Sequence, residues 1–207
     1  AIARAVQPGC KFDNVLVLHG PQGTMKSTFF NVLADPWFAD SFFDIRQRQA
    51  FLTIAAAWIY EMAEIESIVG TREDPDVKRF LSSKIDTFTP PYGKAAVQHP
   101  RSTILVGTTN EDAIFKDPSG NRRYWVIHVP RKINIPLLKE WRLQLWAEAL
   151  DMFSAGIPFY LDDAAEIDQA EANQAYTQVH PWRAPIVRWL TETWHSKPRE
   201  PEKFMDD

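Results

Sequence analysis

The chain has 207 residues, of which 45% are hydrophobic and 24% are charged, a composition that excludes an intrinsically disordered protein. Its formal net charge is −4, so any nucleic-acid binding must come from local basic clusters. Cys10 is the only cysteine, which excludes a disulfide framework within one chain and favours a reducing, cytoplasmic location. We expect no membrane span, because no apolar run approaches the roughly 18 residues that a span requires.

Strands and helices are predicted to alternate along the first two thirds of the chain. Four short apolar runs predict buried strands, at 15–18, 55–62, 103–107 and 123–129. Helices are predicted over 26–33 and over 74–83, the second beginning at a capping Asp74 followed by a proline. Residues 87–101 contain Pro-Pro-Tyr-Gly and indicate a hairpin or an extended loop.

The last third is predicted to be helical. Asn134 should cap a long helix ending near Gly156, with one buried face made of Leu138, Trp141, Leu145, Ala149 and Phe153. Acidic residues 162–171 indicate an exposed connecting helix, and an amphipathic helix is predicted from Trp182, Ile186, Trp189 and Leu190. The whole pattern predicts an α/β fold, a mainly parallel sheet flanked by helices. We expect a core over 1–156 and a C-terminal helical extension and tail over 157–207.

Residues 20–28, GPQGTMKST, match the phosphate-loop pattern G-x-x-x-x-G-K-S/T at every position except Met25. A strand is predicted before them and a helix after them, as a loop that surrounds phosphates requires. Lys26 should lie on the β- and γ-phosphates of ATP, and the Ser27 hydroxyl should bind Mg²⁺. The residues predicted to bind the nucleotide are Gly20, Gln22, Gly23, Thr24, Met25, Lys26, Ser27 and Thr28.

Met25 stands where the pattern has a glycine, and that glycine commonly takes a positive φ. A residue with a side chain in that conformation costs roughly 1–2 kcal/mol. Bound triphosphate with Mg²⁺ can offset this cost, so we expect nucleotide binding to persist. The rate of hydrolysis is the property that the substitution puts in question.

Polar side chains follow two of the predicted strands. Glu61 and Glu64 lie at the end of the strand over 55–62, where an ATPase needs one carboxylate to hold Mg²⁺ and another to orient water. The sequence does not assign the two roles, although Glu61 is the metal ligand we favour beside Ser27. Asn110 follows the strand over 103–107, where an amide can hydrogen-bond both the γ-phosphate and the attacking water.

In this order, these motifs resemble the virulence-associated protein E family of phage and prophage ATPases, which is similar to superfamily 3 helicases. The likeness runs from about Val15 to Trp189. Its carriers are GPQGTMKSTFF, WIYEMAEIE, VKRFLSSKIDTFTPPYGK, ILVGTTNE and DPSGNRRYWVIHV. The resemblance implies a P-loop, AAA+-like NTPase that assembles into a hexameric ring and moves along DNA. Since the chain begins at Ala1, we expect a piece of a longer protein, whose flanks the ring could need.

The resemblance also implies roles for residues outside the loop. Either Arg122 or Arg123 would complete the ATP site of the neighbouring subunit and stabilise the transferred phosphoryl group. Lys84, Tyr92 and Lys94 lie in a segment that supplies the DNA-contacting hairpin in such helicases. Their cations and aromatic ring suit sequence-tolerant binding of single-stranded DNA.

The leading hypothesis is therefore a helicase or translocase core that couples ATP hydrolysis to movement along single-stranded DNA during phage or mobile-element replication. The main alternative is an ATP-binding assembly module in which Met25 impairs hydrolysis. A small-molecule or nucleoside kinase built on the same loop is a third hypothesis, but no arginine-rich lid segment is evident in the core.

Overall fold

The computed structural model describes residues 1–41, 48–69, 75–90, 92–115, 121–178 and 182–195. Contacts divide the chain into two compact units, Ala1–Thr177 and Gln178–Asp207. The first unit contains the sheet and nearly all of the helices, and the following paragraphs concern it. No helix in the described ranges is long and apolar enough to cross a membrane.

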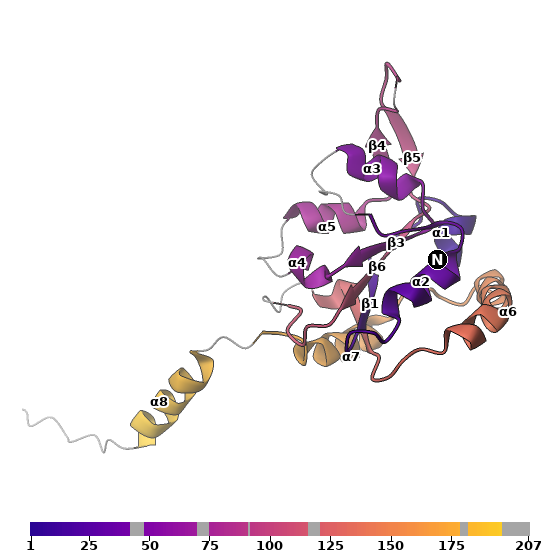
Figure 1. Ribbon diagram of the computed structural model, residues 1–207. Coiled ribbons are helices and arrows are strands. Elements are labelled where there is room, and N and C mark those ends of the chain that lie inside the picture. The colour runs from indigo at the N-terminus through magenta and orange to yellow at the C-terminus, as the bar shows by residue number, and fades with distance from the viewer. Residues whose placement is uncertain (42–47, 70–74, 91, 116–120, 179–181, 196–207) are drawn as a thin grey trace, which may run out of the picture. The chain divides into compact units, whose positions relative to one another are not determined.

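A five-stranded sheet in which every neighbouring pair is parallel forms the centre of the first unit (Figure 1). Its strands are β1 (Val15–His19), β2 (Phe38–Ala39), β3 (Ile59–Ala63), β6 (Ile104–Thr109) and β7 (Tyr124–His128). The order across the sheet is β2-β3-β6-β1-β7, so β6 lies between β1 and β3. Because the strands are parallel, the segments that follow β1, β3 and β6 meet at one edge. The predicted α/β class with a parallel sheet is confirmed.

Helices cover both faces of the sheet. They are α1 (Ile2–Val6), α2 (Lys26–Ala34), α3 (Arg48–Ala55), α4 (Ile65–Val69), α5 (Pro75–Ser82), the short 3₁₀ helix η1 (Asn121–Arg123), α6 (Ile135–Ser154) and α7 (Asp163–Gln174). On one face, Phe30 of α2 packs with Leu18 and Val106, and Trp146 of α6 lies against this cluster. On the other face, residues of α3, α4 and α5 pack on Val17 and Leu105. The core is thus two apolar layers around the sheet.

A separate antiparallel hairpin is made of β4 (Ile85–Phe88) and β5 (Val97–Pro100). It projects from the body of the unit beside α3 (Figure 1). Of the two forms expected for residues 87–101, the hairpin is the correct one. β5 leads into the central strand β6 through three residues, 101–103.

The predicted strand over 55–62 begins too early. Ala55 is the last residue of α3, and β3 begins only at Ile59. The Thr103 hydroxyl donates hydrogen bonds to the carbonyls of Ile54 and Ala57, and these bonds satisfy carbonyls at the end of α3 and just after it. Ala55 belongs to the helix, as alanine's helix propensity favours, and Ala56 and Ala57 lie in the connection between α3 and β3. For the helix predicted over 74–83, Asp74 lies outside the described residues, and α5 begins at Pro75.

Asn134 caps α6 as predicted, accepting a hydrogen bond from the Leu137 backbone N–H at 3.1 Å. The predicted buried face of α6 is wrong in part, because Trp141 and Leu145 are 53% and 41% exposed. The side toward the sheet instead carries Trp146, whose indole N–H donates to the Leu33 carbonyl at 3.0 Å. The helix has apolar residues on several sides, so spacing alone could not identify which side is buried.

Helix α7 is more firmly attached than the exposed connecting helix that its acidic sequence predicts. Asn173 is completely buried and donates hydrogen bonds to the carbonyls of Asn121 and Tyr124 at 2.7 and 2.8 Å. The first compact unit runs from Ala1 to Thr177 and so includes α7. Within the second unit, a helix is confirmed at the place where one is predicted, as α8 (Arg183–His195).

Candidate functional site

The loop between β1 and α2 has two backbone positions that define its shape. A Cβ atom on Gly20 would lie 2.3 Å from the Val129 carbonyl oxygen, so this position requires glycine. Met25 has φ 69° and ψ 30°, which is left-handed backbone, directly before Lys26 begins α2. Met25 therefore adopts the positive-φ conformation that is expected for the glycine of the motif. The Met25 sulfur accepts a hydrogen bond from the Thr28 hydroxyl at 3.7 Å.

Lys26 lies at the centre of this loop and is only 7% exposed. Its ammonium donates hydrogen bonds to the carbonyls of Gly20 and Pro21 at 2.7 and 3.0 Å. A third bond, of 2.7 Å, goes to the side-chain oxygen of Asn110. Burial lowers the pKa of Lys26 from 10.5, and the nearby negative charge of Glu61 acts in the opposite direction. The structure thus brings together the lysine of the loop and the amide at the tip of β6, as predicted.

Glu61 is buried directly beneath the start of α2, with 2% of its surface exposed. Its Oε1 atom accepts hydrogen bonds from the hydroxyls of Ser27 at 2.7 Å and Thr108 at 2.6 Å. Its Oε2 atom is buried, and no donor in the described part of the chain reaches it. Thr108 is absent from the residues predicted for the site. The signal that could have found it is the Thr-Thr pair immediately before Asn110 at the end of an apolar strand.

Ser27 and Glu61 fit a magnesium ion bound beside a phosphate. Carboxylate and hydroxyl oxygens are ligands that Mg²⁺ accepts, and it is usually held by one or two carboxylates together with phosphate oxygens. The partnerless Oε2 atom of Glu61 is a buried anionic acceptor that a cation would satisfy. The donor set and this orphaned oxygen therefore agree with the predicted metal pair.

A cavity of about 270 Å³ opens above these groups. Its lining comes from the loop and from the ends of β3 and β6: Gln22, Gly23, Thr24, Met25, Lys26, Ser27, Thr28, Ala63, Glu64, Thr108, Thr109 and Asn110. Glu64 is exposed in this wall and has φ 51°, whereas Glu61 is buried below it. The two acids that the sequence could not tell apart thus occupy different places, one at Ser27 and one at the solvent-facing rim.

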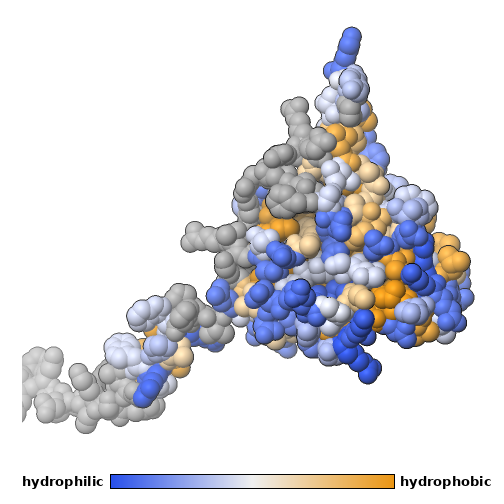
Figure 2. Space-filling view, viewed as in Figure 1, coloured by the Kyte–Doolittle hydropathy of each residue, from blue (hydrophilic) through white to orange (hydrophobic). Residues whose placement is uncertain are grey.

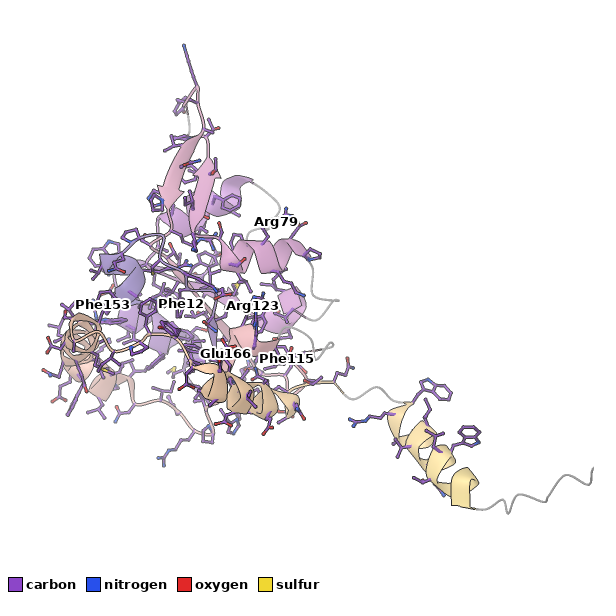
Figure 3. All side chains as sticks on the ribbon, turned by 180° about the vertical axis from the view of Figure 1, so that it is seen from behind. Phe12, Arg79, Phe115, Arg123, Phe153 and Glu166 are labelled. Atoms are coloured by element: carbon purple, nitrogen blue, oxygen red, sulfur yellow. The ribbon has the colours of Figure 1, made fainter. Side chains whose placement is uncertain are left out.

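The arginine pair lies elsewhere. Arg122 and Arg123 belong to η1, just before Tyr124, which pairs with Val15 at the start of β1. The loop follows the other end of β1, five residues on, so roughly 16 Å of strand separates the arginines from it. Arg123 Nε lies 4.0 Å from Asp13 Oδ2, and Figure 3 labels Arg123 within the body of the unit. The structure does not bring these arginines into the cavity of their own chain.

The three residues predicted to contact DNA lie at two levels of the hairpin. Tyr92 is fully exposed near the tip, with φ 64°, and Lys94 is exposed beside it. Lys84 is exposed at the foot, immediately before β4. Figure 2 shows hydrophilic side chains at the end of this projection. Tyr92 and Lys94 are therefore close in the hairpin, and Lys84 is separated from them by the length of β4.

Comparison with known proteins gives one family and a set of distant structures. The family model described as a virulence-associated protein E-like domain matches residues 1–178. A search of curated proteins found no match. Two solved apo structures of the NrS-1 C-terminal region are similar, at 15% and 16% identity with TM-scores of 0.48 and 0.45. They cover 92% and 86% of this chain, and the chain spans 50% and 46% of theirs.

Proposed function

Because the chain belongs to the virulence-associated protein E-like domain family, we propose that it is a P-loop, AAA+-like ATPase core that moves along single-stranded DNA during phage or mobile-element replication. The observation that carries this proposal is the convergence of Lys26, Ser27, Glu61 and Asn110 at one edge of the parallel sheet. These groups come from three adjacent strand ends, β1, β3 and β6. Ligands of open α/β sheets bind at such an edge.

Each of these side chains has a role that its position supports. The Lys26 ammonium exchanges its bonds to the loop carbonyls for bonds to the β- and γ-phosphates of ATP. Ser27 and Glu61 are the residues that would hold Mg²⁺, which would supply positive charge against the charge that develops on the phosphates. Asn110, already bonded to Lys26, lies where its amide reaches the γ-phosphate region. The N-terminus of α2, with its free backbone N–H groups and the positive end of the helix dipole, adds a further attraction for the anion.

Glu64 is the residue that we assign to the attacking water. It is exposed in the cavity wall, where water reaches it, while Glu61 is occupied by two hydroxyl donors. A carboxylate at the rim can accept a proton from water as the water attacks the γ-phosphorus. This division of roles assigns Mg²⁺ to the buried acid and proton transfer to the exposed one.

The proposal extends to a homo-oligomeric ring. An arginine located away from its own cavity suits a neighbour's ATP site better than its own, and Arg122 and Arg123 are so placed. A projecting hairpin with an exposed tyrosine and lysine suits contact with the bases and backbone of single-stranded DNA. We propose that rings of this kind place the hairpins around a central strand.

The test is ATP turnover of the purified protein with and without single-stranded DNA, beside a mass measurement with and without ATP. We expect turnover that DNA stimulates and that Lys26→Ala reduces by 10²-fold or more, since one stabilising charge contributes on the order of 3–4 kcal/mol. The matched control is Lys132→Ala, an exposed lysine beyond β7. Absence of turnover in the ring form with DNA would overturn the motor proposal.

One observation favours a second candidate function. Met25 occupies left-handed backbone in the wall of the cavity, where its side chain is next to the site of phosphate binding. An ATP-binding assembly module would bind ATP tightly, assemble on it and release no phosphate. The same turnover and mass measurements separate the two functions.

A further inference from the structure

The hairpin and the ATP site lie at the two ends of one continuous stretch of chain. β5 ends at Pro100, a three-residue linker follows, and β6 runs from Ile104 to Thr109. The next residue, Asn110, is hydrogen-bonded to Lys26. The end of β6 beside Lys26 is thus connected to the hairpin by a single strand and a short linker (Figure 1), so a movement at one end would reach the other.

The linker begins with a buried arginine that binds the hairpin to the body. The Arg101 side chain is completely buried, and its Nε and Nη2 atoms donate to the two carboxylate oxygens of Asp86 at 2.9 and 2.5 Å. Its Nη1 atom donates to the carbonyl of Phe80 on α5, and its guanidinium lies 4.9 Å from the centre of the Phe80 ring. One side chain therefore joins strand β4, the linker and helix α5.

The end of the linker is held equally firmly. The Thr103 hydroxyl donates to the Ala57 carbonyl at 2.6 Å, between α3 and β3. The Thr103 carbonyl accepts a bond of 2.9 Å from Arg4, another buried arginine. Since both ends of so short a linker are fixed by buried hydrogen bonds, the linker has little freedom to bend.

The far end of β6 is fixed to the ATP site. The Gly20 N–H donates to the Thr109 carbonyl at 3.2 Å, and Thr108 donates to Glu61. We propose that β6 and the buried Arg101–Asp86 pair form a rigid connector that couples the ATP site to the position of the hairpin, with Arg101 as the positioning residue. This inference rests on the proposed function and names how its two parts communicate.

The chemistry of the Arg101–Asp86 pair favours a role in positioning the hairpin over a role in stability alone. A buried ion pair is often no more stabilising than well-packed apolar residues of similar size, because both charges lose their hydration. A two-bond contact from a planar guanidinium to a carboxylate does fix the orientation of the linker relative to strand β4. By linkage, a factor by which ATP changes DNA affinity is also the factor by which DNA changes ATP affinity.

The test replaces the pair by apolar residues, in Asp86→Leu/Arg101→Met. We expect a folded protein with unchanged basal ATP turnover. In the unaltered protein, a non-hydrolysable ATP analogue should change the affinity for a fluorescent oligo-dT by about fivefold or more, and in the variant this ratio should fall to about one. The control is Asp76→Leu/Arg79→Met, which removes the exposed pair on α5 that Figure 3 marks at Arg79.

Amide hydrogen exchange provides a readout that does not depend on ATP or DNA. The variant should exchange faster at 85–88 and 97–99 and at an unchanged rate at 104–109. Should the double variant not fold, Arg101→Lys, which keeps the charge but loses the planar contact, takes its place in both measurements.

The two proposals fail in different ways. If the unaltered protein neither hydrolyses ATP nor binds oligo-dT, the proposed function is wrong, and hydrogen exchange alone decides whether Arg101 positions the hairpin. If the folded variant keeps the affinity ratio of the unaltered protein, or keeps full protection of the hairpin amides, the connector is overturned.

Discussion

Met25 shows what a single position of the loop requires from the backbone. The motif predicts a glycine there, and the structure explains why, because the backbone is left-handed at φ 69°. The left-handed backbone at this position could be predicted from the motif alone. That the methionine side chain lines the cavity and contacts Thr28 could not, because it depends on how α2 packs against β3 and β6.

Replacing Met25 by glycine should stabilise the protein. Relief of the left-handed strain, partly offset by the greater freedom of glycine in the unfolded chain, should raise the free energy of unfolding by about 0.5–1 kcal/mol. Thermal unfolding measures this, with Met25→Ala as the control that keeps the strain. A glycine variant less stable than the alanine variant would show that the strain estimate is wrong.

A sharp rise in ATP turnover in Met25→Gly would identify hydrolysis as the step that methionine limits.

The pH dependence of ATP binding should report on Lys26. Burial lowers its pKa from 10.5, so the ammonium loses its proton at a lower pH than an ordinary lysine does. Since the charged form binds phosphate, ATP affinity should fall as the pH rises through this lowered pKa. In the same window, the unfolded chain binds more protons than the folded one, so this group makes stability rise with pH.

Titration calorimetry across the alkaline range, up to pH 10.5, measures that affinity, and Lys26→Arg is the control. Arginine keeps its charge throughout, so its affinity, whatever its size, should not decline with pH. An equal decline in both proteins would assign the effect to another group.

Among the elements, α7 differs most from its prediction. Its acidic sequence indicates an exposed helix, and most of its residues are indeed exposed. The buried Asn173 bonds it to the backbone of Asn121 and Tyr124, and Gln169 adds a longer bond of 3.3 Å to the Tyr124 carbonyl. No periodicity distinguishes one buried amide from the exposed ones around it, so this attachment could not be read from the sequence. By contrast, the bounds predicted for β1 and β6 are correct to within two residues, because buried parallel strands are continuous apolar runs.

Removing the Asn173 amide should therefore be costly. In Asn173→Ala, the Asn121 and Tyr124 carbonyls each lose the bond from the buried amide, although Gln169 Nε2 still donates to Tyr124 at 3.3 Å, and we expect a loss of about 1–3 kcal/mol in the free energy of unfolding. Urea unfolding measures this, and Gln174→Ala, at the neighbouring exposed position, should change stability by less than about 0.5 kcal/mol. Equal effects of the two substitutions would mean that the amide contributes no more than helix propensity.

Across the whole molecule, the sequence predicted which side chains gather at the loop. It did not predict that the arginine pair would lie away from them. Glu61, Ser27, Lys26 and Asn110 come together because they follow adjacent parallel strands, a relation that motif order supplies. Arg122 and Arg123 lie at the opposite edge of the sheet, and the role proposed for them depends on a neighbouring subunit. No pattern within one chain can supply that geometry.

A mixing experiment tests that role. Lys26→Ala lacks the lysine of the loop, and Arg122→Lys/Arg123→Lys lacks the arginines while keeping their charge. Each should be inactive alone. Random mixing in equal amounts joins an intact loop to intact arginines at one interface in four, so about a quarter of the unaltered turnover should return. Turnover that stays at the level of the separate variants would exclude arginines supplied by a neighbour.

The three-residue linker between β5 and β6 has a consequence for how such sequences can change over evolution. The turn between β4 and β5 connects the two ends of a projecting ribbon, so insertions there disturb little of the sheet. One residue inserted at 101–103 would shift the face on which each side chain of β6 lies, including Thr108. We therefore expect relatives of this chain to vary in length at the tip and to keep a constant spacing from Arg101 to Asn110.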